Sequence, residues 1–180
     1  MVAKNNGSGT AELEFILHTD SGMVSAMGAV DAGAQGVFED VVGLIGADGQ
    51  KGSLEICSSE PLEAVARIYN VSDDGTFGQF LDGISYPGLG EGASGRLYGL
   101  RQRAGEFRTN ITVTNTGMET ATVEITLYGT DGAELHSYEL SVGSGMAVQD
   151  IEPFRERAST PNVGWGFAKV TVVSGSGVIN

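Results

Sequence analysis

Apolar and polar side chains alternate along much of this chain with a period of two residues. In the segment 11–18, Ala11, Leu13, Phe15 and Leu17 share one face, and the other face holds Glu12, Glu14 and His18, with Ile16 as the exception. The segment 110–115 shows the same alternation and runs into an Asn-Thr-Gly turn. This period is typical of a β-strand that buries one of its two faces.

The pattern predicts further strands, separated by turns that are rich in glycine and aspartate. These strands are expected at 23–30, 35–41, 51–57, 62–70 and 121–128. Glycine accepts a positive φ angle and aspartate can bond its own backbone, so Asp31 and Gly33 favour a turn. Helix is expected only for a turn or two near 42–45 and 154–157. The sequence therefore predicts an all-β fold with strands at the spacing of a sandwich.

The second half of the chain resembles the first half at a shift of 110 positions, without a gap from residue 1 to residue 41. The identical pairs include Asn5/Asn115, Gly7/Gly117, Ala11/Ala121, Leu17/Leu127 and Asp40/Asp150. These matches fall on strand faces and turns, which are the positions that a structural repeat retains. We therefore expect two tandem antiparallel β-sandwiches related by an internal repeat.

The predicted domains are a first repeat at 1–75, a packed junction loop at 76–106 and a second repeat at 107–180 with a truncated final strand. The junction is rich in glycine but also carries large apolar side chains. We expect some of its residues to hold the two sandwiches together, and the candidates are Phe77, Phe80, Arg101, Phe107 and Arg108.

Several motifs of the chain resemble a tandem Ig-like module found near the C-termini of large secreted or surface proteins of bacteria. The motifs are Ala66-Arg-Ile-Tyr-Asn70, Gly75-Thr-Phe-Gly-Gln-Phe80, Leu100-Arg101 and Phe107-Arg-Thr-Asn110 with Asn115. The resemblance implies an extracellular or cell-surface pair of Ig-like β-sandwiches with an accessory or structural role. It supplies no catalytic residues.

Composition and charge argue against some classes of binding partner. The formal net charge is -13, and nucleic-acid binding needs clustered Lys and Arg, so no nucleic-acid partner is expected. No apolar run reaches the length of a transmembrane helix, so no membrane insertion is expected. Residues 1–9 are polar and do not resemble a signal peptide. The single Cys57 is expected to be a small buried side chain.

Candidate catalytic chemistry is sparse, and we expect no enzyme activity and no cofactor. His18 and His136 are the only histidines, and both fall at positions that differ between the repeats, which favours the surface. The segment around Ser94 lacks the second glycine of a nucleophile elbow, because Arg96 stands there. Zinc would need Cys and His at close spacing, which is missing.

Two kinds of ligand site remain as candidates. Trp165, Tyr98 and Tyr86 could form an aromatic platform for a glycan, or they could pack in the core or at the junction. Asp73, Asp74 and Asp82 are weak candidates for the ligands of a calcium site. Calcium prefers several converging oxygen ligands.

The predicted function is a non-catalytic extracellular structural or adhesive module of a larger bacterial protein. The alternative is a module that binds a glycan or another surface ligand through loops at one end of a sandwich. The repeat register places both ends of the chain inside strands. We therefore expect self-association through incomplete strand edges, with 177–180 and 2–5 as the contacts.

Overall fold

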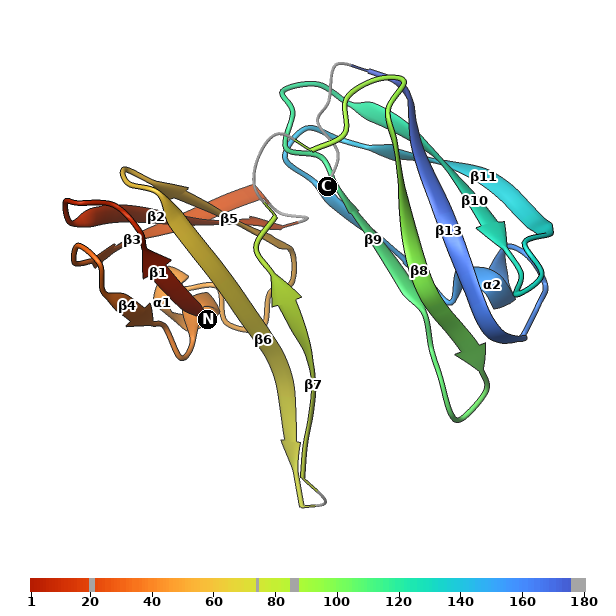
Figure 1. Ribbon diagram of the computed structural model, residues 1–180, viewed down its shortest axis with the longest axis horizontal. Coiled ribbons are helices and arrows are strands. Elements are labelled where there is room, and N and C mark those ends of the chain that lie inside the picture. Colours follow the sequence, from red (N-terminus) through yellow and green to blue (C-terminus); the bar gives the residue numbers. More distant parts are fainter. Residues whose placement is uncertain (20–21, 74, 85–87, 176–180) are drawn as a thin grey trace. The chain divides into compact units, whose positions relative to one another are not determined.

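The computed structural model describes residues 1–19, 22–73, 75–84 and 88–175. These residues form antiparallel β-sheets and two short helices, so the predicted all-β fold is confirmed. The chain divides into two compact units, Met1–Ser85 and Tyr86–Asn180, which we call unit 1 and unit 2 (Figure 1).

The described residues of unit 1 form two antiparallel sheets. In the three-stranded sheet, β2 (Ala11–Thr19) lies between β3 (Gly22–Val30) and β5 (Ser53–Ser58). In the four-stranded sheet the order is β4 (Gln35–Val37), β1 (Val2–Asn5), β6 (Leu62–Ser72) and β7 (Gly75–Asp82).

The core of unit 1 is built on the alternation that the sequence displays. Leu13, Phe15 and Leu17 of β2 are buried and belong to one apolar cluster with Ala3 of β1. Gly28 is needed beside this cluster, because a Cβ atom there would lie 2.8 Å from the Phe15 ring. Residues of both sheets thus share one core.

Within 88–175, unit 2 also forms two antiparallel sheets. The larger sheet has the order β11 (Glu134–Val142), β10 (Ala121–Tyr128), β13 (Asn162–Ser174) and β8 (Ser94–Arg103). The smaller sheet pairs β12 (Ala147–Ile151) with β9 (Asn110–Thr114).

The core of unit 2 is also built on alternating apolar positions. Val123, Ile125 and Leu127 of β10 are fully buried and cluster with Ile111 and Val113 of β9. The alternating segments at 110–115 and 121–128 therefore supply the facing sides of this core, as their period requires.

Both short helices lie where the sequence predicts them. Helix α1 (Val41–Ile45) starts at Asp40, whose Oδ1 accepts a 2.9 Å hydrogen bond from the Gly43 N–H, and it ends at Gly46 with φ 75°. Helix α2 (Pro153–Glu156) has proline in its first turn, where no intrahelical N–H bond is lost.

A buried asparagine closes the turn after β1. The Asn5 side chain is fully buried, and its Nδ2 donates to the carbonyl oxygens of Gly9 (2.8 Å) and Val30 (2.9 Å). Its Oδ1 accepts from the Gly7 N–H at 2.8 Å. One side chain thus connects the end of β1, the following turn and the end of β3.

Asn115 makes the same three hydrogen bonds in unit 2, and it is also fully buried. Its Nδ2 donates to the carbonyl oxygens of Glu119 (2.7 Å) and Val142 (2.9 Å), and its Oδ1 accepts from the Gly117 N–H at 2.9 Å. Every partner lies 110 or 112 residues after the corresponding partner of Asn5.

Two expectations about local structure are wrong. The predicted junction loop at 76–106 contains most of β7 and all of β8, because β7 pairs with β6 and β8 pairs with β13. Local glycine content predicts a loop there, but pairing with distant strands fixes an extended backbone. Cys57 is exposed, because its partner in the register is Glu14, on the outward face of β2.

The expected open edge at 2–5 is also absent. Strand β1 pairs with β4 on one side and with β6 on the other, so its backbone groups have partners along both edges. The second expected contact, at 177–180, lies outside the described residues. Self-association remains a prediction, but an open edge at 2–5 no longer supports it.

Across the residues that the structure describes, no helix is long and apolar enough to cross a membrane.

Replacing either buried asparagine by alanine should destabilise its unit. Asn5→Ala and Asn115→Ala each remove three hydrogen bonds and leave buried backbone groups unpaired, so we expect a loss of about 2–4 kcal/mol in unfolding free energy. Urea unfolding followed by circular dichroism measures this loss. Asn6→Ala, at an exposed neighbour, is the control and should change stability little. Equal stability of all three variants would contradict the role assigned to the buried amides.

Candidate ligand-binding face of unit 2

Three aromatic side chains form a row across the outer face of the larger sheet of unit 2. Tyr128 of β10, Phe167 of β13 and Tyr98 of β8 are partners in the strand register. The Tyr128 and Phe167 rings stack with centroids 4.4 Å apart, and the Phe167 and Tyr98 rings are 5.9 Å apart. The neighbours Leu127 and Ala168 are buried, so the row lies on the face opposite the core.

A second group of rings extends this face beyond the row. The Arg101 guanidinium lies over the Phe107 ring at 3.5 Å and over the Trp165 ring at 4.7 Å from the centroids. Its Nε donates a 3.1 Å hydrogen bond to the Gly164 carbonyl oxygen, which fixes its plane. A Cβ atom on Gly99 would lie 3.9 Å from the Trp165 ring, so the indole lies close to the β8 backbone beside Tyr98.

A buried polar network holds the Arg101 segment in place. The Thr109 hydroxyl donates to the Arg101 carbonyl oxygen (2.7 Å) and accepts from the Arg101 N–H (3.1 Å). The buried Gln102 side chain accepts from the Thr109 N–H and donates to Glu152 Oε1 at 2.7 Å. Glu152 has φ 51°, an uncommon conformation for a residue other than glycine. These bonds fix the end of β8, and with it the Arg101 side chain.

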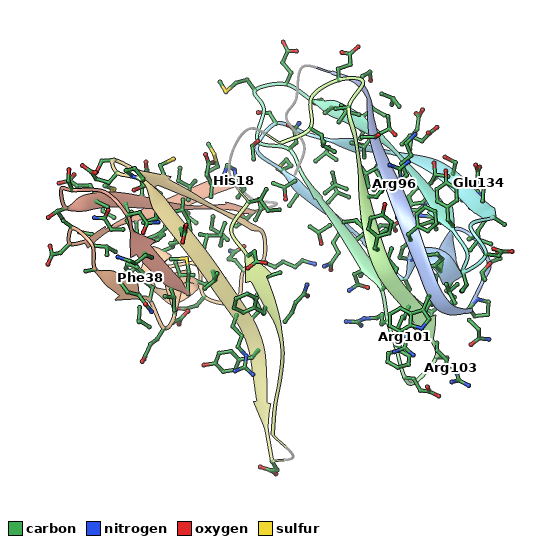
Figure 2. All side chains as sticks on the ribbon, in the orientation of Figure 1. His18, Phe38, Arg96, Arg101, Arg103 and Glu134 are labelled. Atoms are coloured by element: carbon green, nitrogen blue, oxygen red, sulfur yellow. The ribbon has the colours of Figure 1, made fainter. Side chains whose placement is uncertain are left out.

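Charged side chains divide the same face into two halves. Arg96 of β8 and Lys169 of β13 are direct partners in the register, next to the aromatic row. The strands β10 and β11 contribute carboxylates instead, including Glu124 opposite Glu139 and Glu134 opposite Tyr128. Figure 2 shows Arg96 on β8 and Glu134 at the far side of the sheet, with Arg101 and Arg103 toward the end of β8.

The structure brings together two of the three predicted aromatic ligands. Tyr98 is 72% exposed and Trp165 is 59% exposed, and both belong to this face. Tyr86 lies outside the described residues. Phe167 and Tyr128 were not predicted. Tyr128 follows Leu127 in the alternation and so points outward, but its pairing with Phe167 depends on a register that the sequence does not reveal.

The predicted junction residues are placed differently. Arg101 and Phe107 contact each other within unit 2, and Arg101 bonds a backbone carbonyl. Arg108 is exposed. Phe80 is 62% exposed on β7, and the side chain of Phe77 lies outside the described part of the chain. Packing of these residues between the two units stays a prediction.

Two of the three candidate calcium ligands, Asp73 and Asp82, lie far apart. Asp73 lies in the turn after β6, and Asp82 pairs with Val65 at the other end of the β6–β7 hairpin. The length of β7 separates them by about 25 Å. Asp74 lies outside the described residues. Among the residues that are described, no group of three or more His, Cys, Asp or Glu could hold a metal ion.

One polar cluster in unit 1 resembles a catalytic arrangement but lacks its electrostatics. His18 is buried rather than on the surface as predicted, because β2 is the central strand of its sheet, and its Nε2 lies 2.8 Å from Glu55 Oε2. The Cys57 sulfur lies 3.8 Å from the other Glu55 oxygen. Desolvation and the carboxylates of Glu55 and Glu14 raise the pKa of the Cys57 thiol, so little thiolate forms at neutral pH. His136 is exposed, as predicted.

Comparison with known proteins adds little to this picture. No family model matches the chain, and no curated protein matches it. One solved structure that matches is the Anabaena sensory rhodopsin transducer, with 18% sequence identity over 52% of this chain and 96% of that chain, at a TM-score of 0.39. At this level the likeness carries no argument about fold or function.

The stacking of Arg101 can be followed through Trp165, the single tryptophan of the chain. Arg101→Ala uncovers one side of the indole, so quenching of its fluorescence by acrylamide should increase. Loss of a cation–π contact at a partly exposed site should cost about 0.5–1 kcal/mol of stability. Arg103→Ala is the control, because Arg103 is exposed and pairs with Glu106. Unchanged quenching in Arg101→Ala would show that the guanidinium does not cover the ring in solution.

Proposed function

We propose that this chain is a non-catalytic binding module that attaches to carbohydrate through the aromatic face of unit 2. The observation that carries the proposal is the row formed by Tyr98, Phe167 and Tyr128 with Trp165 beside it. Large rings left on a surface lose the free energy of burial, so an exposed apolar patch of this kind marks a binding site.

The chemistry of the face suits sugars. Pyranose rings present flat arrays of C–H groups that pack on aromatic faces, while their hydroxyl groups bond nearby polar side chains. Trp and Tyr combine a large apolar surface with a polar tip, which is why they dominate binding sites that are partly wet. The extended, flat shape of a sheet face suits a polysaccharide chain better than a small compact ligand.

The corresponding face of unit 1 is different, which favours a role in binding over a role in folding. We propose that the two units form an internal repeat of β-sandwiches, supported by the matching hydrogen bonds of Asn5 and Asn115. On the described strands β2, β3 and β5, the outward positions hold no Phe, Tyr or Trp and include Glu14, Glu55 and Met27. A feature required by the fold would occur in both copies.

The wider setting follows from the resemblance to tandem Ig-like modules. We propose that the chain belongs to a larger extracellular or cell-surface protein of bacteria, in which it has an adhesive role. Binding of a surface carbohydrate gives that role a physical basis, because a module without a ligand can only act as a spacer. A purely structural module is the alternative.

The proposal predicts that the exposed rings carry the affinity. On a glycan array probed with the intact chain, Trp165→Ala and Tyr98→Ala should each weaken binding roughly tenfold, which corresponds to about 1.4 kcal/mol. Tyr69→Ala is the matched control, because Tyr69 is an exposed tyrosine of unit 1. Ligand binding should also shift the fluorescence of Trp165. Failure to bind any glycan, or equal binding by Trp165→Ala, would contradict the proposal.

A further inference from the structure

We infer that the carbohydrate is acidic, and that the Arg96–Lys169 pair of unit 2 receives its carboxylate. This inference rests on the proposed function, and it adds the charge of the ligand and the residues that recognise this charge. The preferred ligand is a heteropolysaccharide in which uronate residues are separated by neutral sugars.

Two cations lie side by side on this face of unit 2. Arg96 and Lys169 are direct cross-strand partners, so their Cβ atoms lie about 5 Å apart, and like charges at such positions repel each other. The chain has 23 acidic and 10 basic residues, so carboxylates are plentiful. Yet among the described residues, no carboxylate forms an ion pair with Arg96 or Lys169.

The Arg96–Lys169 pair lies beside the aromatic rings. Arg96 is two residues from Tyr98 along β8, and Lys169 is two residues from Phe167 along β13. The charges and the rings thus lie on one face, about 7 Å apart along the strands. A polysaccharide that places one sugar over the rings places a neighbouring sugar over the two cations.

The carboxylates of this face limit the spacing of negative charge along the ligand. The aromatic row ends at Tyr128, whose register partner on β11 is Glu134, and Glu124 lies on β10 beyond Thr126. A polymer with a negative charge on every residue would meet these carboxylates. A chain that alternates uronate with neutral sugar can place its charge over Arg96 and Lys169 and its neutral ring over the aromatic row.

Single-stranded nucleic acid is the main competitor, since it also combines base stacking with basic side chains. Its phosphates repeat at every nucleotide, and the carboxylates of β10 and β11 would repel them. The net charge of -13 adds a long-range repulsion against any densely charged polyanion. Sparse charge on the ligand is therefore favoured.

The test compares matched ligands with and without charge. Oligosaccharides of hyaluronan, unsulfated chondroitin and gellan are titrated against the intact chain, each beside its carboxyl methyl ester. We expect at least one acidic form to bind roughly fivefold to tenfold more tightly than its ester at low salt. The preference should shrink as salt is raised, because screening weakens attraction between exposed charges.

Variants then assign the preference to the pair. Arg96→Gln with Lys169→Gln should remove most of the difference between acid and ester, because the acid should lose more affinity than the ester. Removal of two repelling charges should not lower the melting temperature, which separates recognition from a structural role. Arg67→Gln, in unit 1, is the control and should keep the preference.

The outcomes distinguish this inference from the function on which it rests. Equal binding of acid and ester, both lost in Trp165→Ala, would overturn the inference and keep the carbohydrate function. Absence of binding to every glycan, acidic or neutral, would remove both. Tighter binding of a single-stranded oligo-dT than of any uronate oligosaccharide would also overturn the inference.

Discussion

The pairing of β13 with β8 is the constraint on which the candidate site depends. It places Phe167 beside Tyr98 and Lys169 beside Arg96, and it shifts register twice between Val163 and Phe167. Such an irregularity redirects side chains relative to a regular ladder. Here it coincides with Gly99 at φ 73° and with the Trp165 indole near the same backbone. A regular pairing would place different side chains on this face.

The rigidity of this end of the sheet comes from buried polar groups rather than from apolar packing alone. The bonds of Thr109 and Gln102 fix both the backbone and the direction of the Arg101 segment. Arg101 in turn spans two rings, so its planar guanidinium keeps them apart and oriented. A binding surface that is fixed before the ligand arrives loses less conformational entropy on binding.

The two units share one hydrogen-bonded turn and carry different outer surfaces. Asn5 and Asn115 satisfy the same turn and strand-end groups in each unit, and removing either would leave buried polar groups without partners. Polar groups on the outer faces do not need such partners in the protein, because water can form their hydrogen bonds. The face of unit 1 is acidic around Glu14 and Glu55, whereas the face of unit 2 is aromatic and partly basic. The side chains of the outer faces can therefore differ between the units without a change in the buried residues.

The sequence by itself determined the all-β class, the buried faces of the segments 11–18 and 121–128, and the two short helices. These features depend on local periodicity and on capping residues such as Asp40, which neighbouring positions in the chain reveal. It also indicated Trp165 and Tyr98 as candidates, because large rings beside glycines stand out in an acidic chain.

Only the tertiary structure decided which side chains meet. The sequence of strand β8 predicts a loop because its glycines are unfavourable in an isolated strand, and its extended form depends on β13, whose paired residues lie 59 to 77 positions away in the chain. The outward position of Cys57, the burial of His18 against Glu55 and the Arg96–Lys169 pair all follow from strand register. Register changes the facing of a whole strand when it slips by one residue, and the local pattern does not say which distant strand will be the partner.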